Sequence, residues 1–325
     1  MRLRRRALLA TTLLPSAAAF AQPDQGWRPE RSIRAIVPFA PGGLADLMAR
    51  LVSERAAPLL GQPIAIENRT GGAAGLIGTD LAAKAAPDGY TIVINSSAQA
   101  IAPALVARMP YDAAADFAGI AVLGGAPMVL VGHPSLPARN MQELLALLRA
   151  NPGKFNYAGA GNGSTVHLTG EVFRAAAKVE IQFVHYRGGG PALQAVMSGE
   201  AHLTGVSVAE AASQVRNGTV RAFALSGPQR SPVLAEVPTS AEAGLPGFQQ
   251  DIWVIAAAPV RTPPPIVAAL NAAYNAAARQ IEPKLAELGL EIRADVVTPA
   301  QVDAFLRKEI ERYAAVLRAA GVKPE

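Results

Sequence analysis

Short apolar runs typical of strands alternate with helical patterns along almost the whole chain, and this alternation limits the possible fold more than any other feature. In the first hundred residues we expect strands at 33–39, 63–68 and 91–95, with helices at 45–60 and 75–86 between them. Such a series favours a parallel sheet covered by helices, an α/β architecture. Right-handed crossovers then bring the turns after the first and third strands to one edge of the sheet.

A second series of the same kind follows. The expected strands lie at 128–132, 155–159, 181–186, 202–206 and 220–225, and the expected helices at 141–150, 165–178, 191–197 and 209–216. A strand at 252–257 is expected to return to the first sheet, with helices at 265–280 and 299–320 closing the structure. Asn140 and Glu143 are spaced as a capping box, and Thr298, Pro299 and Gln301 are suited to cap the last helix.

The first 21 residues have the pattern of a signal peptide. Four arginines at positions 2–6 precede an apolar stretch at 7–20 that is too short to span a bilayer, and residues 19–21 form an A-x-A cleavage site. A core helix at this place would have to bury the four arginines. We therefore expect export, and Arg5-Arg6 is compatible with both the Sec and the twin-arginine pathway.

Removal of this segment leaves 26 basic and 25 acidic residues, because four of the 30 basic residues and none of the acidic ones precede position 22. A chain this close to neutrality, without a basic run, lacks the electrostatic footprint of a nucleic-acid-binding protein. The chain has no cysteine, so an exported form depends on a buried core rather than on disulfides. Its length and apolar content suit two domains.

The stretch IVPFAPGGLADLMAR, residues 36–50, passes from a strand through two glycines into a helix. Leu44 and Asp46 follow the glycines, which does not fit a G-x-G-x-x-G dinucleotide loop. Backbone N–H groups at such a helix start suit a carboxylate, and Gly42 and Gly43 allow close approach. Asp46 is expected to accept from loop N–H groups or to hold a water; a tight turn with Asp46 as a simple N-cap is the alternative.

A second strand-turn-helix, AGAGNGSTVH, covers residues 158–167, and Ser164 or Thr165 is placed to cap its helix. The glycine spacing does not match the dinucleotide fingerprint, and the chain has no G-x-S-x-G nucleophile elbow. Histidines 133, 167, 185 and 202 form no i, i+4 pair, so no metal site is expected, and His185 is expected as a core histidine.

The motifs VPFAPGGLAD, GQPIAIENRTGGAAGLIG, AAPDGYTIVINSS, ANPGKFNYAGAGNGSTVHLTGE, VHYRGGGPALQAVMSGE and VPTSAEAGLPGF occur in this order. In this the chain resembles the tripartite tricarboxylate transporter substrate-binding proteins, the Bug receptors, over nearly its whole mature length. The resemblance implies a type II periplasmic-binding-protein fold, with two α/β domains, a ligand cleft between them and two crossing segments as a hinge. We expect residues 22–126 and 250–325 in one domain, 127–249 in the other, and hinge segments near 126–127 and 248–250.

By the same resemblance, the two glycine-rich loops contact ligand carboxylates from opposite sides of the cleft. Tyr186 ends a strand before RGGG, where its hydroxyl is placed to bond a ligand oxygen, whereas Ser96 and Ser97 are equally suited to helix capping. The residues expected at the ligand are Phe39, Ala40, Pro41, Gly42, Gly43, Asp46, Ser96, Ser97, Gly161, Asn162, Gly163, Ser164, Thr165, His167, Tyr186 and Ser207.

The function that this resemblance implies is a monomeric periplasmic receptor that captures a small organic carboxylate and delivers it to membrane transporter subunits, without cofactor, metal or catalysis. A ligand sensor for a membrane signalling partner and an exported α/β enzyme are the alternatives. Many family members carry an acidic residue aligned with Val206, and here no carboxylate lies between Glu200 and Glu210. Burying an ammonium without a counter-charge is unfavourable, so we expect an amine-free ligand: a di- or tricarboxylate, or an aromatic acid packed against Phe39 and Tyr186.

Overall fold

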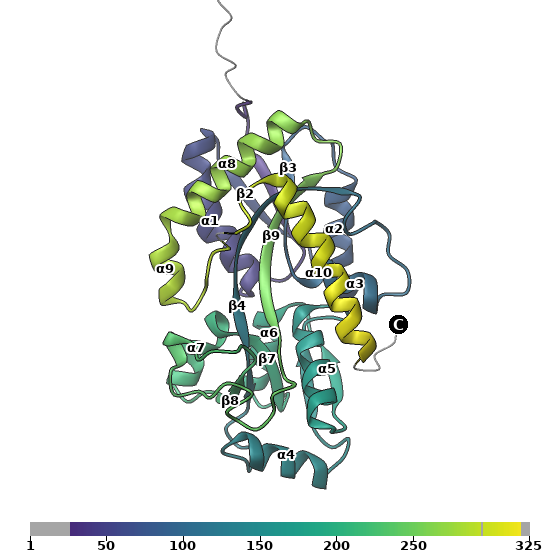
Figure 1. The fold of residues 1–325 in the computed structure, drawn as a ribbon, viewed down its shortest axis with the longest axis vertical. Coiled ribbons are helices and arrows are strands. Elements are labelled where there is room, and N and C mark those ends of the chain that lie inside the picture. The colour runs from purple at the N-terminus through teal and green to yellow at the C-terminus, as the bar shows by residue number, and fades with distance from the viewer. Residues whose placement is uncertain (1–26, 294, 320–325) are drawn as a thin grey trace, which may run out of the picture.

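The computed structural model describes residues 27–293 and 295–319, so the predicted signal peptide lies outside the described residues. Two lobes follow one another along the long axis, and their strands form one nine-stranded sheet (Figure 1). The order is β2-β1-β3-β9-β4-β7-β5-β6, and β8 pairs with β4 beside this path. No helix of the described residues is long and apolar enough to cross a membrane.

The first lobe contains strands β1 (Ile33–Val37), β2 (Ile64–Asn68), β3 (Thr91–Ser96), β9 (Asp251–Pro259) and the first part of β4 (Phe117–Gly132). Its helices are α1 (Leu44–Leu60), α2 (Leu76–Ala83), α3 (Ala98–Leu105), α8 (Pro264–Gln280), α9 (Glu282–Glu287) and α10 (Pro299–Ala319), with a 3₁₀ turn, η1 (Ala73–Gly75), before α2. β1 pairs in parallel with β2 and β3, as the alternating pattern predicts. The strand expected at 252–257 does return to this sheet, antiparallel to β3.

The second lobe contains the end of β4 and strands β5 (Asn156–Gly159), β6 (Gln182–His185), β7 (Leu203–Ser207) and β8 (Arg221–Leu225). Its helices are α4 (Met141–Ala150), α5 (Thr165–Ala177), α6 (Gly189–Met197) and α7 (Val208–Arg216), with a 3₁₀ turn, η2 (Pro232–Leu234). Apart from β4, the predicted helices and strands of this series are confirmed with small differences at their ends. β6 is the last strand of the sheet order, and His185 on it is exposed, so the expectation of a core histidine is wrong.

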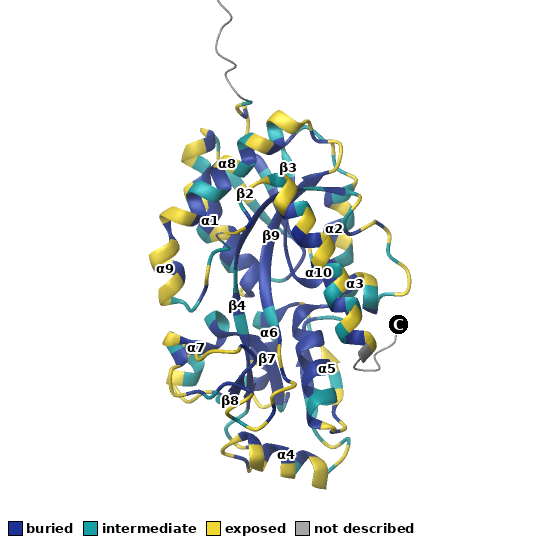
Figure 2. Ribbon diagram, in the orientation of Figure 1, coloured by how far each residue is buried: buried dark blue, intermediate teal, exposed yellow. Residues whose placement is uncertain are grey.

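β4 is longer than the sequence predicts and joins the two lobes. Residues 117–127 pair with β9, whereas Met128–Gly132 pairs with β7 and β8, so the strand changes partners between Pro127 and Met128. Residues 117–127 do not stand out as a strand in the sequence, because Gly124, Gly125 and Pro127 are typical of a turn. In the structure Gly124 has φ of 148° at a register shift, and its neighbour Gly125 pairs with Glu291. β4 and β9 are buried, and the outer faces of the helices are exposed (Figure 2).

The capping predictions are confirmed for the last helix and partly for α4. Thr298 and Gln301 cap α10 reciprocally: the Thr298 hydroxyl accepts from the Gln301 N–H, and Gln301 Oε1 accepts from the Thr298 N–H. Asn140 accepts from the Glu143 N–H at 2.9 Å, but the Glu143 carboxylate accepts from the backbone N–H of Arg139 and the side-chain amide of Asn140 instead of the backbone N–H of Asn140. α3 and α9 were not predicted; α3 contains Pro103 after its first turn, which weakens the helical signal of the sequence.

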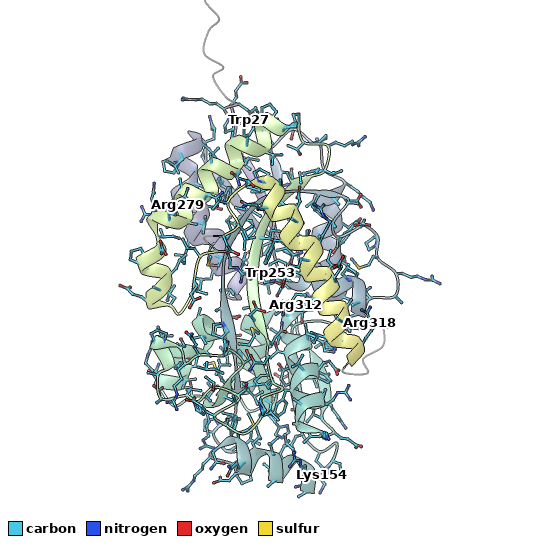
Figure 3. All side chains as sticks on the ribbon, in the orientation of Figure 1. Trp27, Lys154, Trp253, Arg279, Arg312 and Arg318 are labelled. Carbon is cyan, nitrogen blue, oxygen red and sulfur yellow. The ribbon has the colours of Figure 1, made fainter. Side chains whose placement is uncertain are left out.

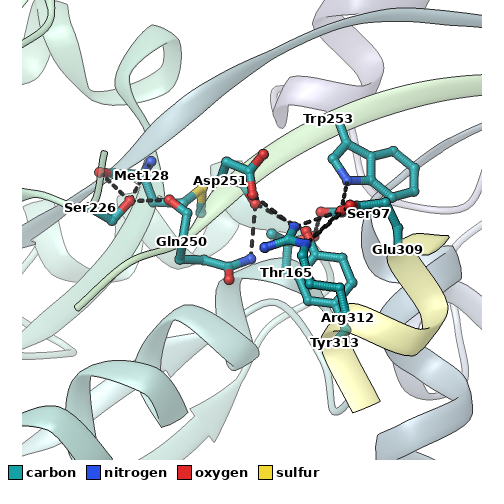
Figure 4. A network of polar contacts seen from close by, with 10 residues as sticks. All are labelled: Ser97, Met128, Thr165, Ser226, Gln250, Asp251, Trp253, Glu309, Arg312 and Tyr313. Atoms are coloured by element: carbon teal, nitrogen blue, oxygen red, sulfur yellow. Dashed lines mark hydrogen bonds and ion pairs between the residues drawn. The ribbon is translucent and has the colours of Figure 1, made fainter. Parts of the chain in front are cut away.

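A polar network connects α10 to the place where β9 begins (Figures 3 and 4). Arg312 pairs with Asp251 at 2.9 Å and with Glu309 at 2.6 Å, and the Trp253 indole N–H donates to Glu309 at 3.0 Å. Glu309 is buried, so its charge depends on these two partners. On the other side of Asp251, the Gln250 carbonyl accepts from the hydroxyl of Ser226 in the second lobe.

We expect Arg312→Met to lower the free energy of unfolding by about 2 kcal/mol, because it leaves the buried Glu309 carboxylate without its strongest donor. Urea unfolding followed by circular dichroism measures this, with exposed Lys308→Met on the same helix as the control. Equal effects of the two substitutions would show that the network adds no stability.

Candidate ligand-binding cleft

Asp46 fixes the shape of the first glycine-rich loop from inside the first lobe. Its buried carboxylate accepts from the Gly42 N–H at 3.2 Å, from Arg50 Nε and Nη2 at 3.0 and 2.9 Å, and from Asn68 at 3.0 Å. Burial alone would raise the pKa of Asp46, but the hydrogen bonds from Arg50, Asn68 and Gly42 hold it below its usual value. The prediction that Asp46 accepts from a loop N–H is confirmed. With both oxygens engaged, it positions the loop and has little capacity left for a ligand.

The second glycine-rich loop is held in a similar way by its own side chains. Ser164 caps α5 by accepting from the His167 N–H at 3.1 Å, and His167 Nδ1 accepts from the Gly163 N–H at 3.2 Å. The other ring nitrogen of His167 lies 3.5 Å from Glu171, which in turn pairs with Arg174. Gly161 and Gly163 have φ of 98° and 74°, a conformation that favours glycine. His167 therefore shapes the loop.

Two serines at the end of β3 meet the second loop across the boundary between the lobes. The hydroxyls of Ser97 and Thr165 lie 2.7 Å apart, and a hydrogen bond joins them (Figure 4). Ser96 Oγ accepts from the Ala98 N–H at 3.3 Å at the start of α3. Ser96 thus has the capping contact, while Ser97 links the two lobes.

The first loop is in direct contact with the RGGG segment, residues 187–190, of the second lobe. The Ala40 N–H donates to the Arg187 carbonyl at 2.9 Å, and a Cβ atom on Gly190 would lie 3.0 Å from the carbonyl carbon of Gly42. The lobes are therefore in backbone contact, and the cleft is closed. Three consecutive glycines were the sequence signal for this contact, which the analysis did not use.

Two cavities lie along this boundary. A small one of about 30 Å³ is lined by Phe39, Gly43, Leu44, Ala45, Ser96, Ala160, Ser164, Thr165, Val166, Gly189, Glu210 and Ile252. A wider one of about 370 Å³ is lined by Pro38, Phe39, Thr70, Gly71, Gly72, Gly75, Ala160, Gly161, Tyr186 and Arg187. Phe39 and Ala160 line both. A larger cavity of about 730 Å³ lies within the second lobe and includes none of the predicted ligand residues.

Several predicted ligand residues are therefore brought together, and others have different roles. Phe39, Gly43, Ser96, Gly161, Ser164, Thr165 and Tyr186 line one of the two boundary cavities. The Tyr186 hydroxyl donates to Glu200 at 2.9 Å, which differs from the expected ligand contact. Ser207 caps α7 in a capping box with Glu210. The described residues contain no group of three or more acidic or histidine side chains that could hold a metal ion.

Also on the boundary cavities, but not among the expected ligand residues, are the loop at 70–75, Ala160, Arg187, Gly189 and Glu210. GGAAGLIG was noted only as a resemblance motif, and the structure places its first glycines on the wider cavity. Glu210 is the first acidic residue after Glu200 and lies in the first turn of α7. Its place in the capping box with Ser207 matches the S-x-x-E spacing, a signal that predicts a helix start and not a cleft position.

We expect Asp46→Asn to destabilise the protein at neutral pH by about 1 kcal/mol, because the loss of charge weakens the contact with Arg50. Since folding lowers the pKa of Asp46, its contribution is present above the ordinary value of 3.8 and is lost as the pH falls through the folded value. The stability difference between wild type and variant should therefore shrink at acidic pH. The exposed Glu54→Gln on α1 is the control, and a difference that does not change with pH contradicts the assignment.

Comparison with known proteins agrees with this geometry. Residues 48–322 match the family model described as "Tripartite tricarboxylate transporter family receptor". Protein BugT of Bordetella pertussis is 35% identical over 297 residues, 91% of each chain. The structure of periplasmic binding protein BugD superimposes with a TM-score of 0.87 at 31% identity, covering 91% of this chain and 100% of that one. For MatC of Rhodopseudomonas palustris with bound malate, the TM-score is 0.85 at 34% identity, covering 89% and 99%. The chain therefore belongs to the tripartite tricarboxylate transporter receptor family, a family of solute receptors rather than enzymes.

Proposed function

We propose that the chain is a periplasmic receptor that captures a small organic carboxylate between its two lobes and delivers it to a tripartite tricarboxylate-type transporter. The observation that carries the proposal is the start of α1. Its N-cap, Gly43, supplies no side-chain hydrogen bond, and Gly43, Leu44 and Ala45 line the small boundary cavity. The first N–H groups of a helix lack partners and carry a partial positive charge, so a ligand carboxylate there would act as the missing cap.

The opposite wall of the cavity supports the same ligand chemistry. Ser164 and Thr165 at the start of α5, together with Ser96 from the first lobe, bring hydroxyl groups to the cavity. These groups are hydrogen-bond donors that suit a second carboxylate or another oxygen of the ligand. MatC, 34% identical, has bound malate, a dicarboxylate.

For the ligand class, we propose a di- or tricarboxylate, or an aromatic acid packed against Phe39 and Tyr186. Val206 is fully buried in β7, and Asp46 is engaged by Arg50 and Asn68, so neither offers a counter-charge to a ligand amine. Export follows from the signal-peptide pattern at 1–21, through Sec or the twin-arginine pathway, and we propose that the mature receptor acts as a monomer.

Ligand entry requires the lobes to separate. The small cavity of about 30 Å³ is far below the several hundred Å³ of ordinary ligand pockets. We propose that residues 22–126 and 250–325 move as one domain and 127–249 as the other, bending near 126–127 and 248–250, where β4 changes partners and β9 begins.

A thermal-shift panel tests the ligand class. Succinate, malate, adipate, citrate and benzoate are compared with succinamide as the uncharged control. A true ligand at a hundred times its dissociation constant should add about 2.7 kcal/mol of stability. Stabilisation by neutral compounds only would refute the carboxylate proposal, and mass spectrometry of the natively purified protein would identify the compound that takes its place.

Gly190→Ala tests closure. The added Cβ would meet the carbonyl carbon and oxygen of Gly42 at 3.0 and 3.1 Å, contacts that exist only between the lobes. We expect about tenfold weaker binding with an unchanged fold, since relieving such a clash costs on the order of 1 kcal/mol or more. Gly153→Ala, at a turn of the second lobe where the new atom would meet nothing within 4 Å, is the comparison outside the boundary.

Calorimetry measures the affinities of the two variants, and small-angle scattering measures the compaction on binding. Wild-type affinity and compaction in Gly190→Ala would mean that the bound state does not have the lobe contact described above.

A further inference from the structure

Glu210 is a cleft side chain with unused hydrogen-bonding capacity. Its Oε2 accepts twice from Ser207, from the N–H at 3.1 Å and from the hydroxyl at 2.6 Å. Its Oε1 is buried and has no hydrogen-bond partner among the described residues. The side chain lines the same small cavity as the start of α1. An unpartnered buried oxygen at a ligand site costs free energy that a ligand donor would recover.

Glycines from both lobes make room for this oxygen. A Cβ atom on Gly189 would overlap with Glu210 Oε1, and one on Gly43 would lie 3.5 Å from it. The Leu44 amide at the start of α1 also lowers the pKa of the Glu210 carboxyl group, so the two groups lie close together. Oε1 itself has no hydrogen-bond partner among the described residues. Glu210 of the second lobe therefore lies close to the start of α1, where we propose that the ligand carboxylate binds. The inference below rests on that proposed function.

We propose that Glu210 determines ligand specificity: its Oε1 pairs with a hydroxyl group next to the ligand carboxylate bound at α1, so the receptor favours hydroxy acids over otherwise identical acids. A site built to hydrogen-bond a hydroxyl rejects the analogue that lacks it, because the buried protein group is then left unpaired.

A neutral donor fits this oxygen better than an ammonium. Burial raises the pKa of Glu210 against the opposing hydrogen bonds from Ser207, and no charged side chain is among the causes. A carboxyl group whose charged form is disfavoured by burial is a weaker counter-charge for an ammonium, whereas its pairing with a hydroxyl does not depend on that charge.

Calorimetry with matched acid pairs tests the inference. The pairs succinate and malate, glutarate and 2-hydroxyglutarate, tricarballylate and citrate, and phenylacetate and mandelate each differ by one hydroxyl group. For the pair that binds, wild type should prefer the hydroxy acid at least about tenfold, since an unpaired buried group costs about 1–3 kcal/mol. Glu210→Met should reduce this preference to about twofold or less through weaker binding of the hydroxy acid, whereas Glu210→Gln, which can still cap α7, should keep most of it. Exposed Glu236→Gln is the control.

Four outcomes would overturn the inference, and they are distinguishable. Equal binding within every pair by wild type would mean that Glu210 reads no ligand hydroxyl, while the carboxylate receptor proposal would stand. An unchanged preference in folded Glu210→Met would assign the selection to another group. Tighter binding of aspartate than of malate, lost in Glu210→Gln, would show that the carboxyl reads an ammonium. If no acid of any pair binds, the proposed function itself fails and takes this inference with it.

Discussion

The antiparallel pairing of β4 with β9 is the interaction on which the rest of the structure depends. β4 continues from this pairing into the second lobe, and β9 begins where β4 changes partners. The boundary is therefore crossed by paired backbone, which limits the directions in which the lobes can move. Asp251, the first residue of β9, is held by Arg312 of α10 on one side, and its neighbour Gln250 by Ser226 on the other.

Some polar side chains of the cleft fix the shape of the loops, and others are left to contact a ligand. Asp46 and His167 accept from N–H groups of their own loops, Gly42 and Gly163, and so fix the loop backbone. Because these side chains are engaged internally, the N–H groups and hydroxyls nearer the boundary remain for the ligand. A site of this kind is preorganised, which reduces the entropy lost on binding.

Much of the fold could be predicted from sequence, because alternating strand and helix patterns with short turns leave few arrangements open. The elements that could not be predicted have local physical causes. Gly124 and Pro127 interrupt the strand pattern of β4, and Pro103 weakens the helical pattern of α3. The glycine loops were found because a strand-turn-helix is a local pattern. Their partners were not, since contacts such as Ala40 with Arg187 join residues far apart in the chain. Glu210 was missed for the same reason, as its spacing to Ser207 accounts for a helix cap and says nothing about the lobe it faces.

The glycines at the lobe boundary connect closure to ligand chemistry. A side chain at position 190 would press against the backbone of Gly42 at 3.0 Å, so the missing Cβ atom there allows the two lobes to approach this closely, and a Cβ atom at position 189 would collide with Glu210 within the second lobe. The same approach buries Glu210 Oε1 without a partner. Closure without a ligand therefore leaves an unsatisfied polar atom, which raises the free energy of the closed state. A ligand that supplies a hydrogen-bond partner removes this cost. Differential stabilisation of the closed form is what a binding protein needs for its ligand to shift the equilibrium between open and closed states.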